Sequence, residues 1–133
     1  MGLFEDGPVR YIGLMPVTKE AVQRFVDLLI AVRPITHRSM FGGIGLYVDG
    51  VFFAVIDDDR LYFKSDETTA EAYDTLKADV WVIPSKDGPS VMPYREVPSE
   101  ILGDRDRLGE WIDTAKAVAE RKKTKSKSKK KAG

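Results

Sequence analysis

The order of the predicted elements assigns this chain to the α+β class. One helix comes first, three or four strands follow, and then come a second helix, two strands and a third helix. Strands grouped in this way form antiparallel hairpins, whereas a doubly wound parallel sheet needs strands that alternate with helices. Asp49-Gly50, a dipeptide that favours tight hairpins, lies between two apolar runs. We therefore predict a two-layer domain with an antiparallel sheet of about five strands and flanking helices.

The first helix is predicted over residues 18–32. It follows residues 1–17, whose glycines and prolines favour an irregular arm. Thr18 can accept a hydrogen bond from an orphan N–H of the first turn. Apolar residues then recur at helical spacing until Pro34, which forces Arg33 out of the α region. We expect one face of this helix to pack on the sheet.

The segment from Arg38 to Lys64 is the predicted centre of the sheet. Val51 to Ile56 is almost wholly apolar, as in a central strand that is covered on both faces. Asp49-Gly50 predicts a type I′ turn, because both residues tolerate positive φ. Strands are predicted at 36–40, 43–48, 51–57 and 60–64, and the first two can also be one strand bent at Gly42-Gly43.

The second half of the domain has two helices and two strands. A helix is predicted over 66–77, with Asp66 or Thr68 as its cap. Strands follow at 80–83 and 91–97. Pro93 cannot donate to a ladder, so it predicts an edge position or a bulge.

The last helix begins after Asp104, a good N-cap residue, and is predicted to end near Glu120. Its apolar residues recur at helical spacing, so that one face packs on the sheet. That face consists of Leu108, Trp111, Ile112, Ala115 and Ala119.

Charge divides the chain into an acidic body and a basic end. The whole chain has no formal net charge, but residues 1–120 carry 13 basic and 21 acidic side chains, a net charge of −8. Residues 121–133 hold eight basic residues and no acid, and because residues 122–131 include no apolar residue we predict a disordered tail. Such a tail binds DNA weakly and without sequence preference, or it only solubilises the chain. Its basic residues are Arg121, Lys122, Lys123, Lys125, Lys127, Lys129, Lys130 and Lys131.

The composition argues against several kinds of catalytic or metal site. The chain has no cysteine and a single histidine, His37, so a dedicated zinc or copper site is not expected. His37 and Ser39 share a face of the predicted strand, but the sequence shows no orienting environment for a catalytic triad. Asp57 to Asp59 matches the start of a calcium loop in charge alone, and we interpret it as a solvated turn.

Two further motifs are compatible with ligand binding but are better explained by structure. Gly42 to Gly45 has the glycine content of a phosphate-binding loop, yet it leads into a strand, whereas such loops lead into a helix. It also lacks the Gly-Lys-Ser/Thr of a P-loop and the third glycine of a dinucleotide-binding motif. A bulge or a close backbone approach explains it better. Five aromatic residues could form a platform for single-stranded nucleic acid, but few basic residues surround them and core packing is favoured. They are Tyr47, Phe52, Phe53, Tyr62 and Phe63.

These motifs resemble the N-terminal domain of the TfoX/Sxy family over about residues 18–119. The resemblance rests on an Arg-x-Met-Phe-Gly-Gly-x-Gly pattern, a Leu-Tyr-x-Lys pattern and a later Tyr and Pro. It implies a two-layer α+β fold similar to that of secretion chaperones, and kinship with transcriptional co-activators of competence genes. No catalytic residue and no cofactor come with it. The residues that carry it are Arg38, Met40, Phe41, Gly42, Gly43, Gly45, Tyr47, Gly50, Phe53, Ala54, Leu61, Tyr62, Lys64, Tyr94 and Pro98.

The chain also departs from the full-length members of that family. We expect it to lack their second, helical domain and to end in the lysine-rich tail instead. We expect a non-enzymatic regulatory protein of the cytoplasm, whose body contacts a protein partner and whose tail adds non-specific DNA affinity. The alternative is a chaperone-like adaptor without a nucleic-acid role. We expect a monomer or a homodimer in either case, and no association with membranes.

Overall fold

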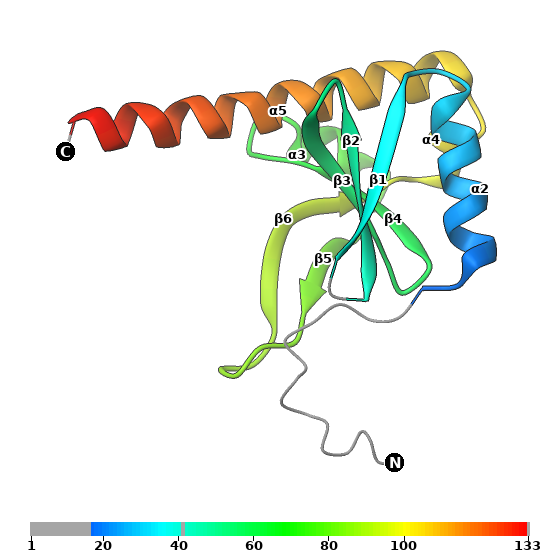
Figure 1. Cartoon of the computed structure of the whole chain (residues 1–133), viewed down its shortest axis with the longest axis horizontal. Helices are drawn as coiled ribbons and strands as arrows, with labels where there is room; N and C mark the ends of the chain where they lie inside the picture. Colours follow the sequence, from blue (N-terminus) through cyan, green and yellow to red (C-terminus); the bar gives the residue numbers. More distant parts are fainter. Residues whose placement is uncertain (1–16, 41, 133) are drawn as a thin grey trace.

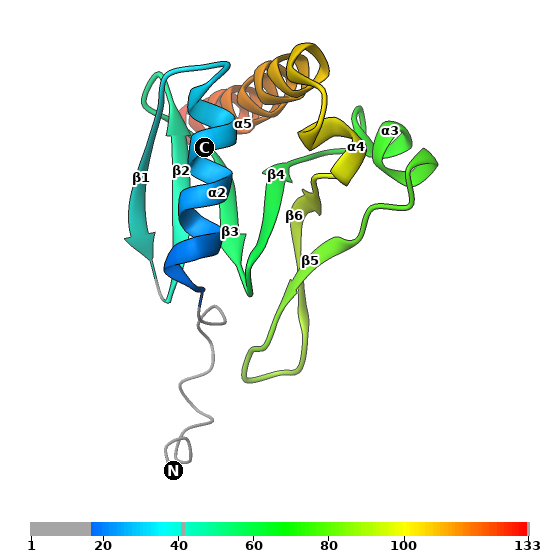
Figure 2. The ribbon, with the colours of Figure 1, turned by 90° about the vertical axis from the view of Figure 1, so that its right-hand side faces the viewer.

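Six strands form one antiparallel sheet. The computed structural model describes residues 17–40 and 42–132, with side chains through Arg121. Within this part of the chain the strand order is β1-β2-β3-β4-β6-β5, and Figure 2 shows the strands in that order. The α+β prediction is confirmed. The strands are β1 (Ile35–Met40), β2 (Gly43–Val48), β3 (Val51–Asp57), β4 (Arg60–Lys64), β5 (Val80–Ile83) and β6 (Ser90–Glu96).

The count of six, in place of about five, comes from the first two strands. They are separate and pair as a hairpin, with Ile35 opposite Val48 and Met40 opposite Gly43. Gly42 follows β1 with a φ of 95°, a conformation that glycine adopts without a steric penalty. Gly42 therefore lies in the reversal between the two strands, and the alternative of one bent strand is wrong.

Four described helices flank the sheet (Figure 1). They are α2 (Lys19–Ile30), α3 (Ala70–Thr75), α4 (Ser99–Leu102) and α5 (Arg105–Ala132). The Thr18 side chain accepts a hydrogen bond from the N–H of Ala21, as the N-cap prediction required. Asp104 caps α5 by accepting from the N–H of Arg107. The second predicted helix is much shorter than 66–77, because a turn stabilised by the Asp66 carboxylate occupies its beginning.

The main core lies between the helices and one face of the sheet. Phe25 of α2, Ile101 of α4 and Leu108 of α5 meet strand residues such as Phe53 and Phe63 there. A second buried cluster lies on the opposite face and is built from strand residues. β3 contributes to both clusters, so the prediction of a central strand covered on both faces is confirmed.

Two tight turns hold the centre of the sheet. Asp49 and Gly50 have φ angles of 50° and 77°, both positive as the predicted type I′ turn requires. Asp58 and Asp59, between β3 and β4, are also at positive φ, at 55° and 58°. Asp59 then accepts hydrogen bonds from the N–H and the hydroxyl of Thr18, at 2.7 and 3.1 Å, so this turn anchors the start of α2.

Irregular pairing occurs at two places. Between β2 and β3 the pairing passes from Leu46–Ala54 to Tyr47–Phe52, which leaves Phe53 as an extra residue of β3. Between β5 and β6 it passes from Val80–Arg95 to Trp81–Met92, so Pro93 lies in the irregular segment. β6 is an interior strand, and of the two alternatives for Pro93 the bulge is confirmed.

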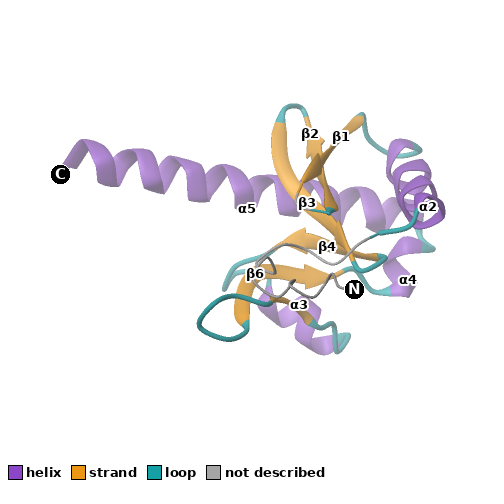
Figure 3. Cartoon of the chain, turned by 60° about the horizontal axis from the view of Figure 1, so that its bottom comes forward, coloured by secondary structure: helices purple, strands orange, loops and turns teal. Residues whose placement is uncertain are grey.

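Helix α5 differs most from its prediction. It continues to Ala132, whereas the prediction ended the helix near Glu120. A helix that already exists extends without a new nucleation step, and lysine and alanine are good helix formers. The prediction considered only the absence of apolar residues. Figures 1 and 3 show that α5 runs well past the sheet.

Candidate functional site

The second buried cluster defines a surface that we call the aromatic face. Its ring contacts form a continuous series across five strands, from Tyr47 through Phe52, Tyr94 and Trp81 to Tyr62. The successive ring centroids are 5.3, 6.2, 5.1 and 5.9 Å apart. Burial raises the pKa of Tyr94 to about 12 and also raises the pKa of Tyr62. In the described part of the chain, no helix residue packs into this cluster.

A buried polar contact fixes one end of the aromatic face. The indole N–H of Trp81 donates to the carboxylate of Asp57 at 2.7 Å, and both residues are buried. A hydrogen bond to an ionised acceptor is stronger than one between neutral groups. It also satisfies the only polar atom of the indole. This contact therefore holds β5 close to the end of β3, two strands that are not neighbours in the sheet.

The edge of the aromatic face is partly open to solvent and carries positive charge. Met40, Phe52 and Met92 pack against the buried rings and are half-buried. The ammonium of Lys64 lies 4.8 Å from the centre of the Tyr94 ring, a cation–π contact. Arg38 is exposed and lies opposite Gly45 in the β1–β2 ladder, which places it on the same face.

Gly45 leaves room for this packing. A Cβ at that position would lie 3.1 Å from the ring of Phe52 and 3.2 to 3.3 Å from the end of Met40. Gly43 and Gly45 are part of β2, so the glycine-rich motif forms a strand that lets two side chains pack over it. The groups that approach Gly45 are side chains, whereas the sequence favoured a bulge or a close approach of backbone.

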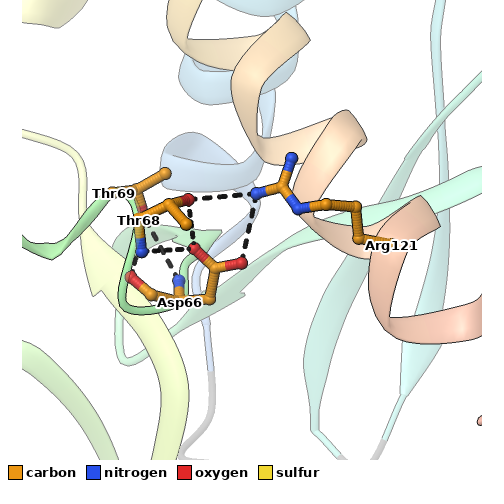
Figure 4. Close-up of polar contacts among 4 residues, drawn as sticks. All are labelled: Asp66, Thr68, Thr69 and Arg121. Carbon is orange, nitrogen blue, oxygen red and sulfur yellow. Dashed lines mark hydrogen bonds and ion pairs between the residues drawn. The ribbon is translucent and has the colours of Figure 1, made fainter. Parts of the chain in front are cut away.

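A second polar cluster holds the base of the basic segment of α5 (Figure 4). The Arg121 guanidinium donates to Asp66 and to the hydroxyl of Thr68, both at 3.1 Å. The Asp66 carboxylate also accepts from the N–H and the hydroxyl of Thr68. Burial opposes ionisation of Asp66, but the hydrogen bonds from Thr68 and Arg121 outweigh it and lower its pKa. We call residues 121–131 the basic extension; the side chains of its lysines lie outside those that the structure describes.

The five predicted aromatic residues do not form one platform. Tyr47, Phe52 and Tyr62 belong to the aromatic face, whereas Phe53 and Phe63 are fully buried in the main core with ring centres 5.3 Å apart. Trp81 and Tyr94 complete the cluster, and neither is among the five aromatic residues singled out from the sequence. Alternation within Val80 to Ile83 could have predicted that Trp81 lies on one side of a strand. It could not have predicted that this strand approaches Asp57.

The other candidate residues lie apart from this cluster. His37 and Ser39 are exposed on β1, an edge strand, and within the described contacts neither hydrogen-bonds to a carboxylate. The interpretation of Asp57 to Asp59 as a solvated turn is wrong for Asp57, which is 4% exposed. Among the residues with described coordinates, no group of three or more His, Asp or Glu could hold a metal ion.

The described surface has pockets of different sizes, and two of about 340 and 510 Å³ are lined largely by charged and polar residues. An apolar one between α3 and α5 has a volume of about 180 Å³ and is lined by Tyr73, Trp111 and Thr68, among others. Sites for small ligands usually measure roughly 300–1,000 Å³.

In the described part of the chain, no helix is long and apolar enough to cross a membrane.

The residues that carry the family resemblance fall into three groups. Six belong to the aromatic face or its edge, namely Arg38, Met40, Tyr47, Tyr62, Lys64 and Tyr94. Phe53, Ala54 and Leu61 are in the main core. Gly42, Gly43, Gly45, Gly50 and Pro98 lie in turns, in β2 or before α4, and Phe41 lies outside the described residues.

Comparison with known families identifies the domain. The family model described as the TfoX N-terminal domain matches residues 27–119, well over half of the chain. The chain belongs to this family. The matched segment includes the whole sheet and most of the packed part of α5, so both faces of the sheet are parts of a TfoX N-terminal domain.

A curated relative supports the assignment. Over 83 residues the chain is 31% identical to a protein named Protein Sxy from Escherichia coli (strain K12). The match covers 62% of this chain and 39% of that protein. The chain therefore aligns with only about two-fifths of the length of its relative, and the role of the whole relative is not established for it.

Proposed function

We propose that this chain is a regulatory protein, similar to the competence regulators of the TfoX/Sxy family, that acts by binding and not by catalysis. The match to the TfoX N-terminal domain over residues 27–119 carries this proposal, and the likeness to Protein Sxy supports it. Two surfaces have suitable properties for such a role. One is the edge of the aromatic face and the other is the basic extension.

The aromatic face is the proposed contact for a protein partner. Buried rings give it a rigid base, and half-buried Met40, Phe52 and Met92 offer apolar area around them. Aromatic residues, methionine and arginine are enriched where proteins bind one another. Arg38 and Lys64 favour a partner that presents an acidic group beside an apolar one.

The basic extension is the proposed DNA contact. It continues a helix whose base is held by the main core and by the contacts of Arg121 with Asp66. Residues 121–132 add about 18 Å to the packed part of α5, and the helix runs well past the sheet (Figures 1 and 3). Lysines that approach phosphates release counterions, which favours binding without sequence preference.

A charge substitution tests the DNA contact while keeping the helix. We expect the full chain to bind a mixed-sequence duplex at about 50 mM salt, measured by fluorescence anisotropy. Replacing the seven lysines of residues 122–131 with glutamine, a residue of similar helix propensity, should weaken binding at least about 100-fold.

Two exposed lysines of the body, Lys19 and Lys86, provide the matched control. Changing both to glutamine should alter affinity by less than about threefold, because the net negative body makes few phosphate contacts. Unchanged binding by the seven-lysine variant would refute the DNA part of the proposal. Absence of binding by the wild-type chain would favour the adaptor without a nucleic-acid role.

A further inference from the structure

The rings of the aromatic face are buried more completely than the described residues around them explain. Tyr62, Trp81 and Tyr94 are 6%, 5% and 4% exposed. The apolar residues described as packing against these rings all belong to strands of the same sheet, and the helices pack on the other face. An antiparallel sheet commonly leaves one face in water, and burial of a face from above needs a second layer. The aromatic face therefore calls for a covering segment.

Residues 1–16 are attached close to the aromatic face. They precede α2 and lie outside the described residues. The described chain begins at the rim of the sheet, because Asp59 in the β3–β4 turn accepts two hydrogen bonds from Thr18. The contact between Asp57 and Trp81 lies at the same end of β3. Residues 1–16 therefore start beside one end of the aromatic face.

The composition of residues 1–16 suits an apolar surface with positive charge at its edge. Leu3-Phe4 is followed directly by Glu5-Asp6, so this stretch presents acidic groups beside apolar ones. Arg38 and Lys64, at the edge of the aromatic face, have the opposite charge, and the two acids outnumber Arg10, the one basic side chain of residues 1–16. Eight of the 16 residues are large and apolar or aromatic, namely Met1, Leu3, Phe4, Val9, Tyr11, Ile12, Leu14 and Met15.

We infer that residues 1–16 fold back over the aromatic face and form the layer that buries its rings. About six extended residues span the roughly 19 Å between the outermost of five strands, so the segment is long enough. Phe41, which also lies outside the described residues, is one side chain and cannot cover rings on five strands. The basic extension continues α5, which packs on the opposite face.

This packing would regulate the proposed partner contact. A segment that covers the aromatic face competes with a protein partner for the same rings, so the partner must displace it. The competition rests on the proposed function, whereas the packing itself does not. The tests below therefore use the full chain without DNA or a protein partner, and their failure would leave the proposed function standing.

A spin label on the full chain tests the packing, because the chain has no cysteine and a single one can be labelled. With a nitroxide on Gly7→Cys, the methyl NMR signals of Met40 and Met92 on the aromatic face should lose most of their intensity. The methyl signals of Leu29, in the main core, should keep theirs. The matched control is Glu110→Cys, an exposed position on α5, and it should give the reverse pattern. Equal intensities on the two faces, or no loss at the methionines, in the Gly7→Cys chain would overturn the inference.

Quenching of Trp81 fluorescence by acrylamide gives a second, independent readout. A Trp111→Phe background leaves Trp81 as the one tryptophan. Adding Phe4→Ser and Ile12→Ser should raise the quenching constant at least about twofold, because the indole loses its cover and becomes accessible to solvent. Thermal unfolding checks that the variant is folded.

The matched control for quenching removes apolar groups near Trp81 from the other face of the sheet. Val82 and Val91 are exposed neighbours of Trp81 and Met92 along β5 and β6, and successive side chains of a strand point to opposite faces. Val82→Ser with Val91→Ser should leave the quenching constant unchanged. Quenching that is the same in the Phe4→Ser, Ile12→Ser chain as in its background would contradict the inference.

Discussion

Asp57 shows how a single residue can link distant parts of the fold. Its carboxylate is buried at the end of β3 and accepts from the indole of Trp81 on β5. Removing the donor leaves a buried carboxylate with fewer hydrogen bonds, a costly change. The aromatic face therefore depends on a polar contact as well as on its rings.

Trp81→Phe should lower the free energy of unfolding by about 2 kcal/mol, because it deletes this hydrogen bond while keeping an aromatic ring. Chemical denaturation measures the change. The control is Trp111→Phe at the other tryptophan, which is half-exposed and contacts Tyr73 edge to face at 4.7 Å. That substitution should cost under about 1 kcal/mol. Equal losses in the two variants would contradict the role given to Asp57.

The carboxylate of Asp66, at the base of the basic extension, should make the stability of the fold depend on pH. Its pKa is lowered from the ordinary 3.8, so the ionised carboxylate stabilises the fold above pH 3.8, and this stabilisation is lost as the pH falls through the lower, folded-state value. Asp66→Asn should cost about 1 kcal/mol at pH 7, and the difference from wild type should shrink below pH 3.8. Urea unfolding over a pH series measures it.

Glu67→Gln provides the comparison for that series. Glu67 is exposed and adjacent to Asp66, so its variant should match the wild-type free energy of unfolding at each pH. A cost of Asp66→Asn that stays constant down to pH 2 would show that the carboxylate charge does not hold Arg121.

At the level of elements, the β3–β4 turn determines where α2 begins. Asp58 and Asp59 have nearly the same φ, but only Asp59 accepts hydrogen bonds from Thr18. Asp59→Asn should therefore destabilise the protein by about 1 kcal/mol. Asp58→Asn should be close to neutral, because asparagine also tolerates positive φ. Thermal denaturation of the two variants compares them, and the account of this anchor fails if both behave alike.

Local signals predicted most of the elements. Thr18 and Asp104 marked helix starts through hydrogen bonds within one turn, and Asp49-Gly50 marked a hairpin through backbone preference. The extent of α3 and α5 was not predictable in this way. Asp66 stabilises a turn in place of helix, and α5 extends because the packed helix before residue 121 needs no new nucleus.

The candidate site was harder to predict from the sequence than the fold. Alternation separates Phe52 from Phe53, but the bulge in the β2–β3 pairing places both Phe53 and Ala54 in the main core, which alternation alone does not predict. The contact between Asp57 and Trp81 joins residues 24 positions apart and depends on the course of the whole sheet. Contacts of this kind arise from tertiary packing, which no periodicity in a single segment records.

The whole molecule combines an acidic body with a basic helical extension. Residues 1–120 carry a net charge of −8, so the proposed DNA contact depends on the eight basic residues that follow them.

The salt dependence of DNA binding tests the central claim most directly. Affinity for a mixed-sequence duplex is measured from about 50 to 300 mM salt for the full chain and for a chain that ends at Glu120. The full chain should show a slope of log K against log salt of about −5 to −7, as expected for six to eight phosphate contacts, and the shortened chain should show little binding. A shortened chain that keeps the affinity and the slope would contradict the account, because the DNA contact would then lie on the body.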